Sequence, residues 1–93
     1  MTQNSMQPGR KVTREIKGGV LRRILIESPM GTRANVFDAS GKLSERYTKR
    51  PDGRWKHDFY NKGVRITSIE FDGMTTTTVV LDVRGRVTAA SEE

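Results

Sequence analysis

The chain has 93 residues, of which 33% are hydrophobic and 30% charged, a length and balance typical of one domain with a thin core. Its 17 Lys and Arg outnumber 11 Asp and Glu, for a net charge of +6, which favours polyanionic partners. It has no cysteine and one histidine, which excludes disulfides, thiolate metal sites and histidine-rich metal sites. We therefore expect no metal and no cofactor.

From the hydropathy along the chain we expect no membrane span and no signal peptide. No apolar run approaches the roughly 20 residues needed to cross a bilayer. The N-terminus lacks the basic start and apolar stretch of a signal peptide. These features predict a cytoplasmic protein without a membrane partner.

The first segment, Met1 to Gly9, is polar and has neither helical nor strand periodicity, so it is expected to be a flexible tail. Residues 10–90 are expected to form a single β domain, and residues 91–93 a C-terminal tail. Turn signals, each ending in glycine, follow at roughly ten-residue spacing, as in an all-β chain. They are Gly18-Gly19, Asp38–Gly41, Pro51–Gly53, Asn61–Gly63, Asp72-Gly73 and Asp82–Gly85.

The stretches between these turns are rich in β-branched and aromatic residues, which suit a pleated sheet. Eight candidate strands result: 11–17, 20–27, 33–38, 42–48, 54–60, 64–71, 74–81 and 86–90. Because every connection is short, neighbours in sequence should pair antiparallel. The prediction is an all-β antiparallel meander of about six to eight short strands, forming either a curled sheet or a small up-and-down barrel, with disordered termini.

The turns at Asp38 and Asp82 share the form apolar-Asp-x-x-Gly-basic-apolar. This weak internal similarity spans two copies, which is too few to name a repeat family.

The segment from Arg46 to Arg65 carries the strongest functional signal, with seven Lys or Arg against two Asp. Alternation in a strand over 54–60 would send Arg54, Lys56, Asp58 and Tyr60 to one face and Trp55, His57 and Phe59 to the other. Cations on such a face can contact phosphates, while Tyr47 or Tyr60 can stack on bases. Equally, Trp55 and Phe59 can be the main core residues of a thin sheet, with the cations keeping its outer face solvated.

A second basic stretch contains Arg10, Lys11, Arg14, Lys17, Arg22 and Arg23, with Glu15 its only acid. If the sheet curls, the two stretches would form one groove that follows a phosphate backbone. The candidate nucleic-acid-binding residues from both stretches are Arg46, Lys49, Arg50, Arg54, Lys56, Tyr60, Lys62, Arg65, Lys11, Arg14, Arg22 and Arg23.

Apolar residues in 64–71 fall on both faces, since Val64 and Ile66 alternate out of step with Ile69 and Phe71. This pattern indicates either a bulge near Thr67 and Ser68 or burial on both faces. Two-sided burial would favour a homo-oligomer.

Three functions remain open at this point. The first is a small basic, non-enzymatic module that binds nucleic-acid phosphates. The second is a protein-binding inhibitor or accessory subunit, whose basic face or sheet edge engages an acidic protein surface. The third is a ribonuclease-like enzyme centred on His57, although alternation places Asp58 and Lys56 away from that histidine and no second acid-base partner is evident.

Overall fold

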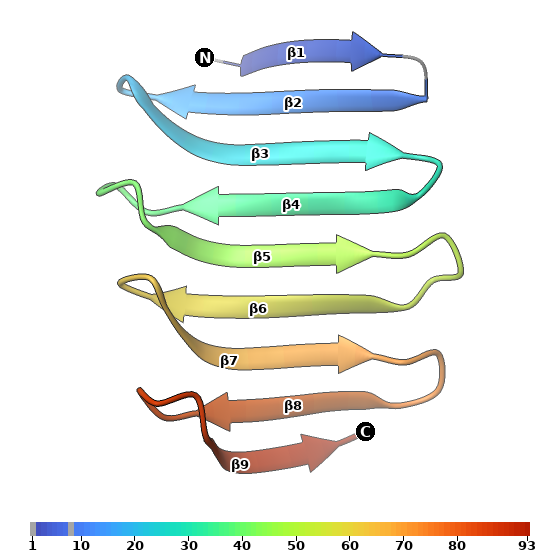
Figure 1. Ribbon diagram of the computed structural model, residues 1–93, viewed down its shortest axis with the longest axis vertical. Coiled ribbons are helices and arrows are strands. Elements are labelled where there is room, and N and C mark those ends of the chain that lie inside the picture. The colour runs from blue at the N-terminus through green and yellow to red at the C-terminus, as the bar shows by residue number, and fades with distance from the viewer. Residues whose placement is uncertain (1, 8) are drawn as a thin grey trace.

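A computed structural model describes the backbone of residues 2–7 and 9–93 and the side chains of residues 9–93. In these residues nine strands form one antiparallel sheet, and each strand pairs with its neighbours in sequence (Figure 1). The strands are β1 (Thr2–Gln7), β2 (Arg10–Lys17), β3 (Val20–Ser28), β4 (Gly31–Phe37), β5 (Leu43–Lys49), β6 (Trp55–Asn61), β7 (Val64–Phe71), β8 (Thr76–Leu81) and β9 (Val87–Glu92). The predicted antiparallel meander is confirmed.

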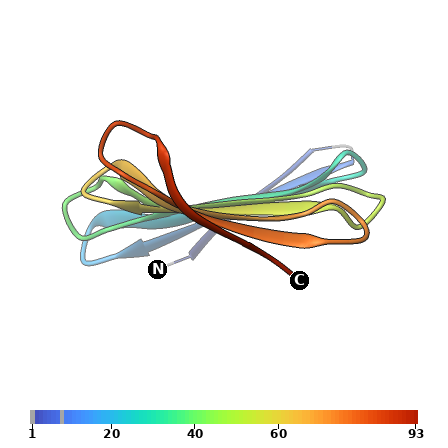
Figure 2. The same ribbon diagram turned by 90° about the horizontal axis from the view of Figure 1, so that it is seen from below.

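The sheet is open and forms a single layer. β1 and β9 lie at its two edges, and the view along the sheet shows one twisted layer (Figure 2). The alternative of a closed barrel is therefore wrong. A barrel encloses the side chains of one sheet face in its interior, and here each face carries charges, such as Arg23 and Glu45 on one and Arg33 and Arg46 on the other.

Both segments expected to be tails contribute to the sheet. Residues 2–7 form β1, which pairs with β2 and adds a strand to the six to eight expected. Ser91 and Glu92 belong to β9, and the backbone of Glu93 exchanges hydrogen bonds of 2.8 and 2.9 Å with Thr76. A polar segment joins a sheet edge because backbone pairing does not depend on apolar side chains. Residues 1 and 8 lie outside the described residues.

Alternate hairpins of the sheet share one irregularity that reveals a sequence repeat. In β2–β3, β4–β5, β6–β7 and β8–β9, the second strand carries one extra residue, a β-bulge. The extra residues are Arg22, Ser44, Ile66 and Thr88, and each lies 22 positions after the previous one. The predicted bulge near Thr67 and Ser68 is thus found one residue earlier, at Ile66.

Glycines recur with the same 22-residue period, one at the turn of each bulged hairpin. Gly19, Gly41, Gly63 and Gly85 close these four turns with φ between 79° and 87°, a left-handed conformation that glycine adopts without steric cost. Each 22-residue unit is therefore two strands with one bulged hairpin, stacked on its neighbours as in other repeat proteins. The shared form of the Asp38 and Asp82 turns was the visible part of this repeat.

The core is thin, as expected for a single layer. Among the described side chains, only Val12, Ala34 and Leu81 are buried hydrophobic residues, and none is fully enclosed. The polar residues Asp58 and Ser68 are buried as well. The described part of the chain contains no helix long and apolar enough to cross a membrane.

Candidate nucleic-acid interface

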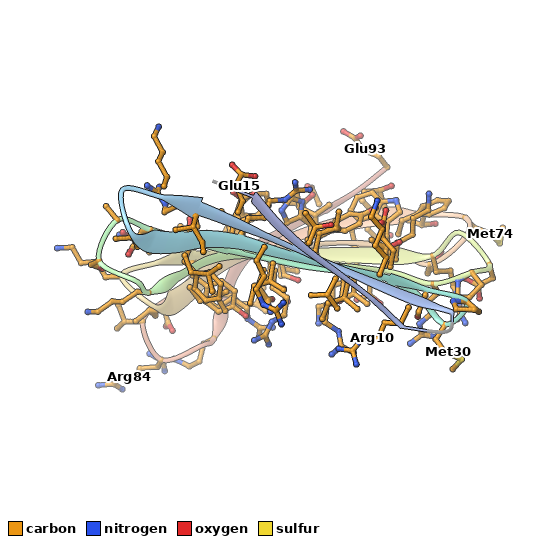
Figure 3. All side chains as sticks on the ribbon, turned by 90° about the horizontal axis from the view of Figure 1, so that it is seen from above. Arg10, Glu15, Met30, Met74, Arg84 and Glu93 are labelled. Atoms are coloured by element: carbon orange, nitrogen blue, oxygen red, sulfur yellow. The ribbon has the colours of Figure 1, made fainter. Side chains whose placement is uncertain are left out.

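Strand alternation gives the sheet two chemically different faces. Residues paired directly across antiparallel strands point to the same side. The row Tyr47–His57–Ile69 therefore marks one face, and the row Arg46–Asp58–Ser68 the other. Figure 3 shows the same division on β2, where Arg10 and Glu15 project to opposite sides. The predicted separation of Lys56 and Asp58 from Trp55, His57 and Phe59 is thus present in β6.

One side of the sheet is the basic face, defined by Arg10, Arg14, Arg33, Arg46, Lys56 and Arg65. Two rows of cross-strand pairs establish it: Arg14–Ile24–Asn35–Arg46–Asp58, and Val12–Ile26–Arg33–Thr48–Lys56–Glu70. Arg65 joins these residues through an ion pair with Asp58. Asp58 and Glu70 are the only acids in the two rows, so the face has an excess of positive charge.

Two adjoining hollows form a groove across the basic face. One is lined by Arg10, Ile26, Arg33, Thr48 and Arg50, among others. The next is lined by Thr48, Arg50, Arg54, Lys56 and Asp58, with Glu70 and Asp72 at its far side. Because Thr48 and Arg50 line both, the hollows lie side by side and together extend from β2 to β7. The groove therefore crosses the strands and has cations along most of its length.

Most of the groove cations are available to a ligand. Among the side chains of residues 9–93, Arg10, Arg33, Arg50 and Lys56 make no ion pair. Arg54 differs, because its Nε lies 2.8 Å from Asp52. Its charge is therefore partly neutralised by its own turn.

Asp58 is a buried carboxylate within the basic face. Its side chain is 10% exposed, and its Oδ1 lies 3.8 Å from Nη1 of Arg65 without a hydrogen bond among the described residues. Arg46, its cross-strand neighbour, donates instead to Oδ1 of Asn35 at 3.3 Å. This buried carboxylate lowers the net charge of the basic face by one.

The twelve predicted binding residues do not all lie together. Arg14, Arg46, Lys56, Tyr60 and Arg65 lie on the basic face. Arg50 and Arg54 lie in the β5–β6 hairpin at the groove, and Nε of Arg22 donates to the carbonyl oxygen of Phe37 at 3.0 Å.

The other four lie elsewhere. Lys11, Arg23 and Lys49 project from the opposite face, and Lys62 is at an exposed turn. Both basic stretches place cations on one face of the open sheet, and this needs no curling, because alternate residues of every strand share that face.

Arg33 was missed as a candidate, although it stands in the middle of the groove. It lies outside both basic stretches, in a β4 segment that is otherwise uncharged. The signal that could have found it is register, since it pairs across the sheet with Ile26 and Thr48. Tyr47, expected as a stacking residue, lies on the opposite face, which leaves Tyr60 beside the cations.

The opposite side is the aromatic face, centred on Tyr47, Trp55, His57, Phe59 and Phe71. The rings form a continuous cluster: Tyr47 lies 6.3 Å from Trp55 and 5.5 Å from His57, and His57 stacks on Phe59 at 4.2 Å. Nε2 of His57 lies 3.0 Å from Oε1 of Glu45. The histidine thus lies among rings on the side away from the basic face, and Glu45 gives it the carboxylate partner that the sequence alone did not reveal.

Aspartates organise the β4–β5 and β8–β9 turns, which lie at the same end of the sheet. The Ser40 hydroxyl, followed by the backbone N–H of Lys42, holds the pKa of Asp38 below its ordinary value. The backbone N–H of Arg86 does the same for the pKa of Asp82. These carboxylates are ionised at neutral pH and serve their own turns, so they leave the charge of the basic face unchanged.

Comparisons with known proteins give no relative. No protein-family model matches the chain, and no curated protein is detectably similar to it. Within residues 9–93, no group of three or more His, Cys, Asp or Glu is placed to hold a metal ion. The groove of cations on the basic face is the most distinctive chemical feature of the described residues.

Proposed function

We propose that this protein is a non-enzymatic module that binds nucleic acid through the phosphates, using the basic face. The observation that carries the proposal is that the strand register brings Arg10, Arg33 and Lys56, which are far apart in sequence, onto one groove, and none of the three makes an ion pair among the described side chains. Neighbouring strands lie roughly 4.8 Å apart and these cations stand on the alternate strands β2, β4 and β6, so the groove offers a cation about every 10 Å along an extended polyanion.

The groove suits a single strand better than a duplex. It is a shallow track across a twisted single-layer sheet, and the described residues include no helix that could enter a major groove. Tyr60 lies on the same face and is half-buried, so it offers a ring for base stacking next to the phosphate contacts. Such a surface selects single-stranded nucleic acid with little preference for sequence.

The test is binding of the purified chain to labelled single-stranded and duplex RNA and DNA over a range of salt, with an acidic protein as control. About five phosphate contacts predict a salt slope near −3.5 for a single strand. Arg33→Ala and Lys56→Ala should each weaken binding and reduce the slope by roughly 0.7. Arg84→Ala is the matched control, because it removes one exposed charge from the turn before β9, and it should have little effect.

Two results would contradict the proposal. Equal binding to the acidic protein would indicate that the basic face engages a protein partner. Equal effects of Arg84→Ala and Arg33→Ala would indicate attraction by net charge alone, without a binding groove.

A further inference from the structure

The aromatic face has no second layer to cover it. Four of the six aromatic residues of the chain, Tyr47, Trp55, Phe59 and Phe71, lie on this face, and they are only half-buried. A sheet buries its apolar face against another layer in stable domains. The chain is 17 Å thick along its shortest axis and supplies no such layer in the described residues.

Side chains on the aromatic face form three parallel rows. The central row is Leu25–Ala34–Tyr47–His57–Ile69. Strand alternation places one further row on each side of the central row, two residues away along each strand. On β5, for example, the flanking residues are Glu45 and Lys49, one on each side of Tyr47.

On each strand that carries charges in both flanking rows, the two charges have opposite sign. Along one flank the order is Lys11, Glu27 and Lys49 on β2, β3 and β5. Along the other flank, on the same strands, it is Glu15, Arg23 and Glu45. Consider two copies whose aromatic faces meet, related by a two-fold axis that runs along the central row. Each flank of one copy then faces the other flank of the second copy, and every charge of the flanking rows lies opposite a charge of the other sign.

The apolar residues obey the same symmetry. The axis places Trp55 opposite Phe59 of a second copy, because these residues flank His57 on β6. It likewise places Phe71 opposite Thr67 on β7. No charge would face an apolar ring: the contact would be aromatic over β6 and β7 and would carry its paired charges on β2, β3 and β5.

We infer that two copies of this chain pack aromatic face to aromatic face as a two-fold β-sandwich. The flanking charges of the aromatic face sum to zero, whereas two basic faces would repel each other. The sheet measures 39 × 34 Å, so one face exceeds the ~800 Å² per partner that a stable interface buries. Such an isologous contact is the commonest arrangement in homo-oligomers.

Sedimentation equilibrium of the full chain tests this inference. The native chain, of 10.5 kDa, should sediment as a dimer. Lys49→Glu places like charges across the interface, opposite Glu45 of the second copy, and should raise the dimer Kd by about tenfold or more. The cross-strand neighbours of Lys49 are the uncharged Thr32 and Trp55, so the fold should tolerate the change.

The matched control is Arg33→Glu, an identical change of charge on the basic face, also between uncharged neighbours. It should leave the Kd within about threefold of the native value. A native chain that stays monomeric at millimolar concentration would overturn the inference, as would equal effects of Lys49→Glu and Arg33→Glu on the dimer Kd.

Discussion

Replacing Gly31 with alanine tests the close approach of two strands at the groove. Gly31 begins β4 with φ at 124°, and a Cβ there would collide with the backbone carbonyl oxygen of Lys49. The left-handed backbone costs an L-residue about 1 kcal/mol. Relieving the collision requires a backbone shift, which costs ~1–3 kcal/mol more. We expect Gly31→Ala to lower the free energy of unfolding by about 2–4 kcal/mol, out of roughly 5–14 kcal/mol for a chain of this length.

Gly53 provides a matched control for that substitution. It occupies the equivalent position of the next 22-residue unit, with φ at 93°, but a Cβ there meets no atom within 4 Å. Gly53→Ala should therefore cost only ~1 kcal/mol. Urea titration followed by the fluorescence of Trp55, the single tryptophan, measures both values. Equal losses in the two variants would refute the collision between β4 and β5.

Three further predictions concern turns and rings. Lys62 has φ at 52°, so Lys62→Asn should raise the free energy of unfolding by about 0.5–1 kcal/mol, measured by urea titration. The pKa of Asp38 is lowered in the folded chain. The ionised carboxylate therefore contributes to stability above the unfolded pKa, and this contribution is lost as pH falls through the folded pKa. Asp38→Ala should flatten the acid side of the pH–stability profile. Trp55→Ala should cost roughly 2 kcal/mol by thermal unfolding, below the cost for a fully buried ring, because this ring is half-exposed.

The turns made the fold predictable from the sequence. Glycines after Asp, Asn or another Gly fixed the ends of eight strands, and short connections left only sequential antiparallel pairing. Whether the sheet closes into a barrel was harder to predict, because open and closed meanders share the same turns. The polar β1 and the end of β9 were missed because their pairing depends on backbone hydrogen bonds, and composition carries no record of those.

The candidate site was predictable strand by strand but not across strands. Alternation within β6 separated Lys56 from Trp55, and the structure has that separation. Predicting that Arg33 and Lys56 share a face needs the register of β4, β5 and β6. A one-residue slip between these strands would move one of the two side chains to the opposite face. The 22-residue spacing of the bulges sets this register. No two of the bulged positions share a residue type, so in the sequence the repeat is carried mainly by the glycines of the turns.

The two proposals together predict a bivalent assembly. If aromatic faces meet at the centre of a dimer, the two basic faces point outward on opposite sides, about one sandwich thickness apart. A native dimer should therefore hold two oligonucleotides at once, detected as energy transfer between donor-labelled and acceptor-labelled strands. Lys49→Glu should abolish this transfer while each monomer still binds one strand, whereas Arg33→Glu should weaken binding and leave the dimer intact. Transfer that persists in monomeric Lys49→Glu would mean that one chain binds two strands, which a single basic face does not provide.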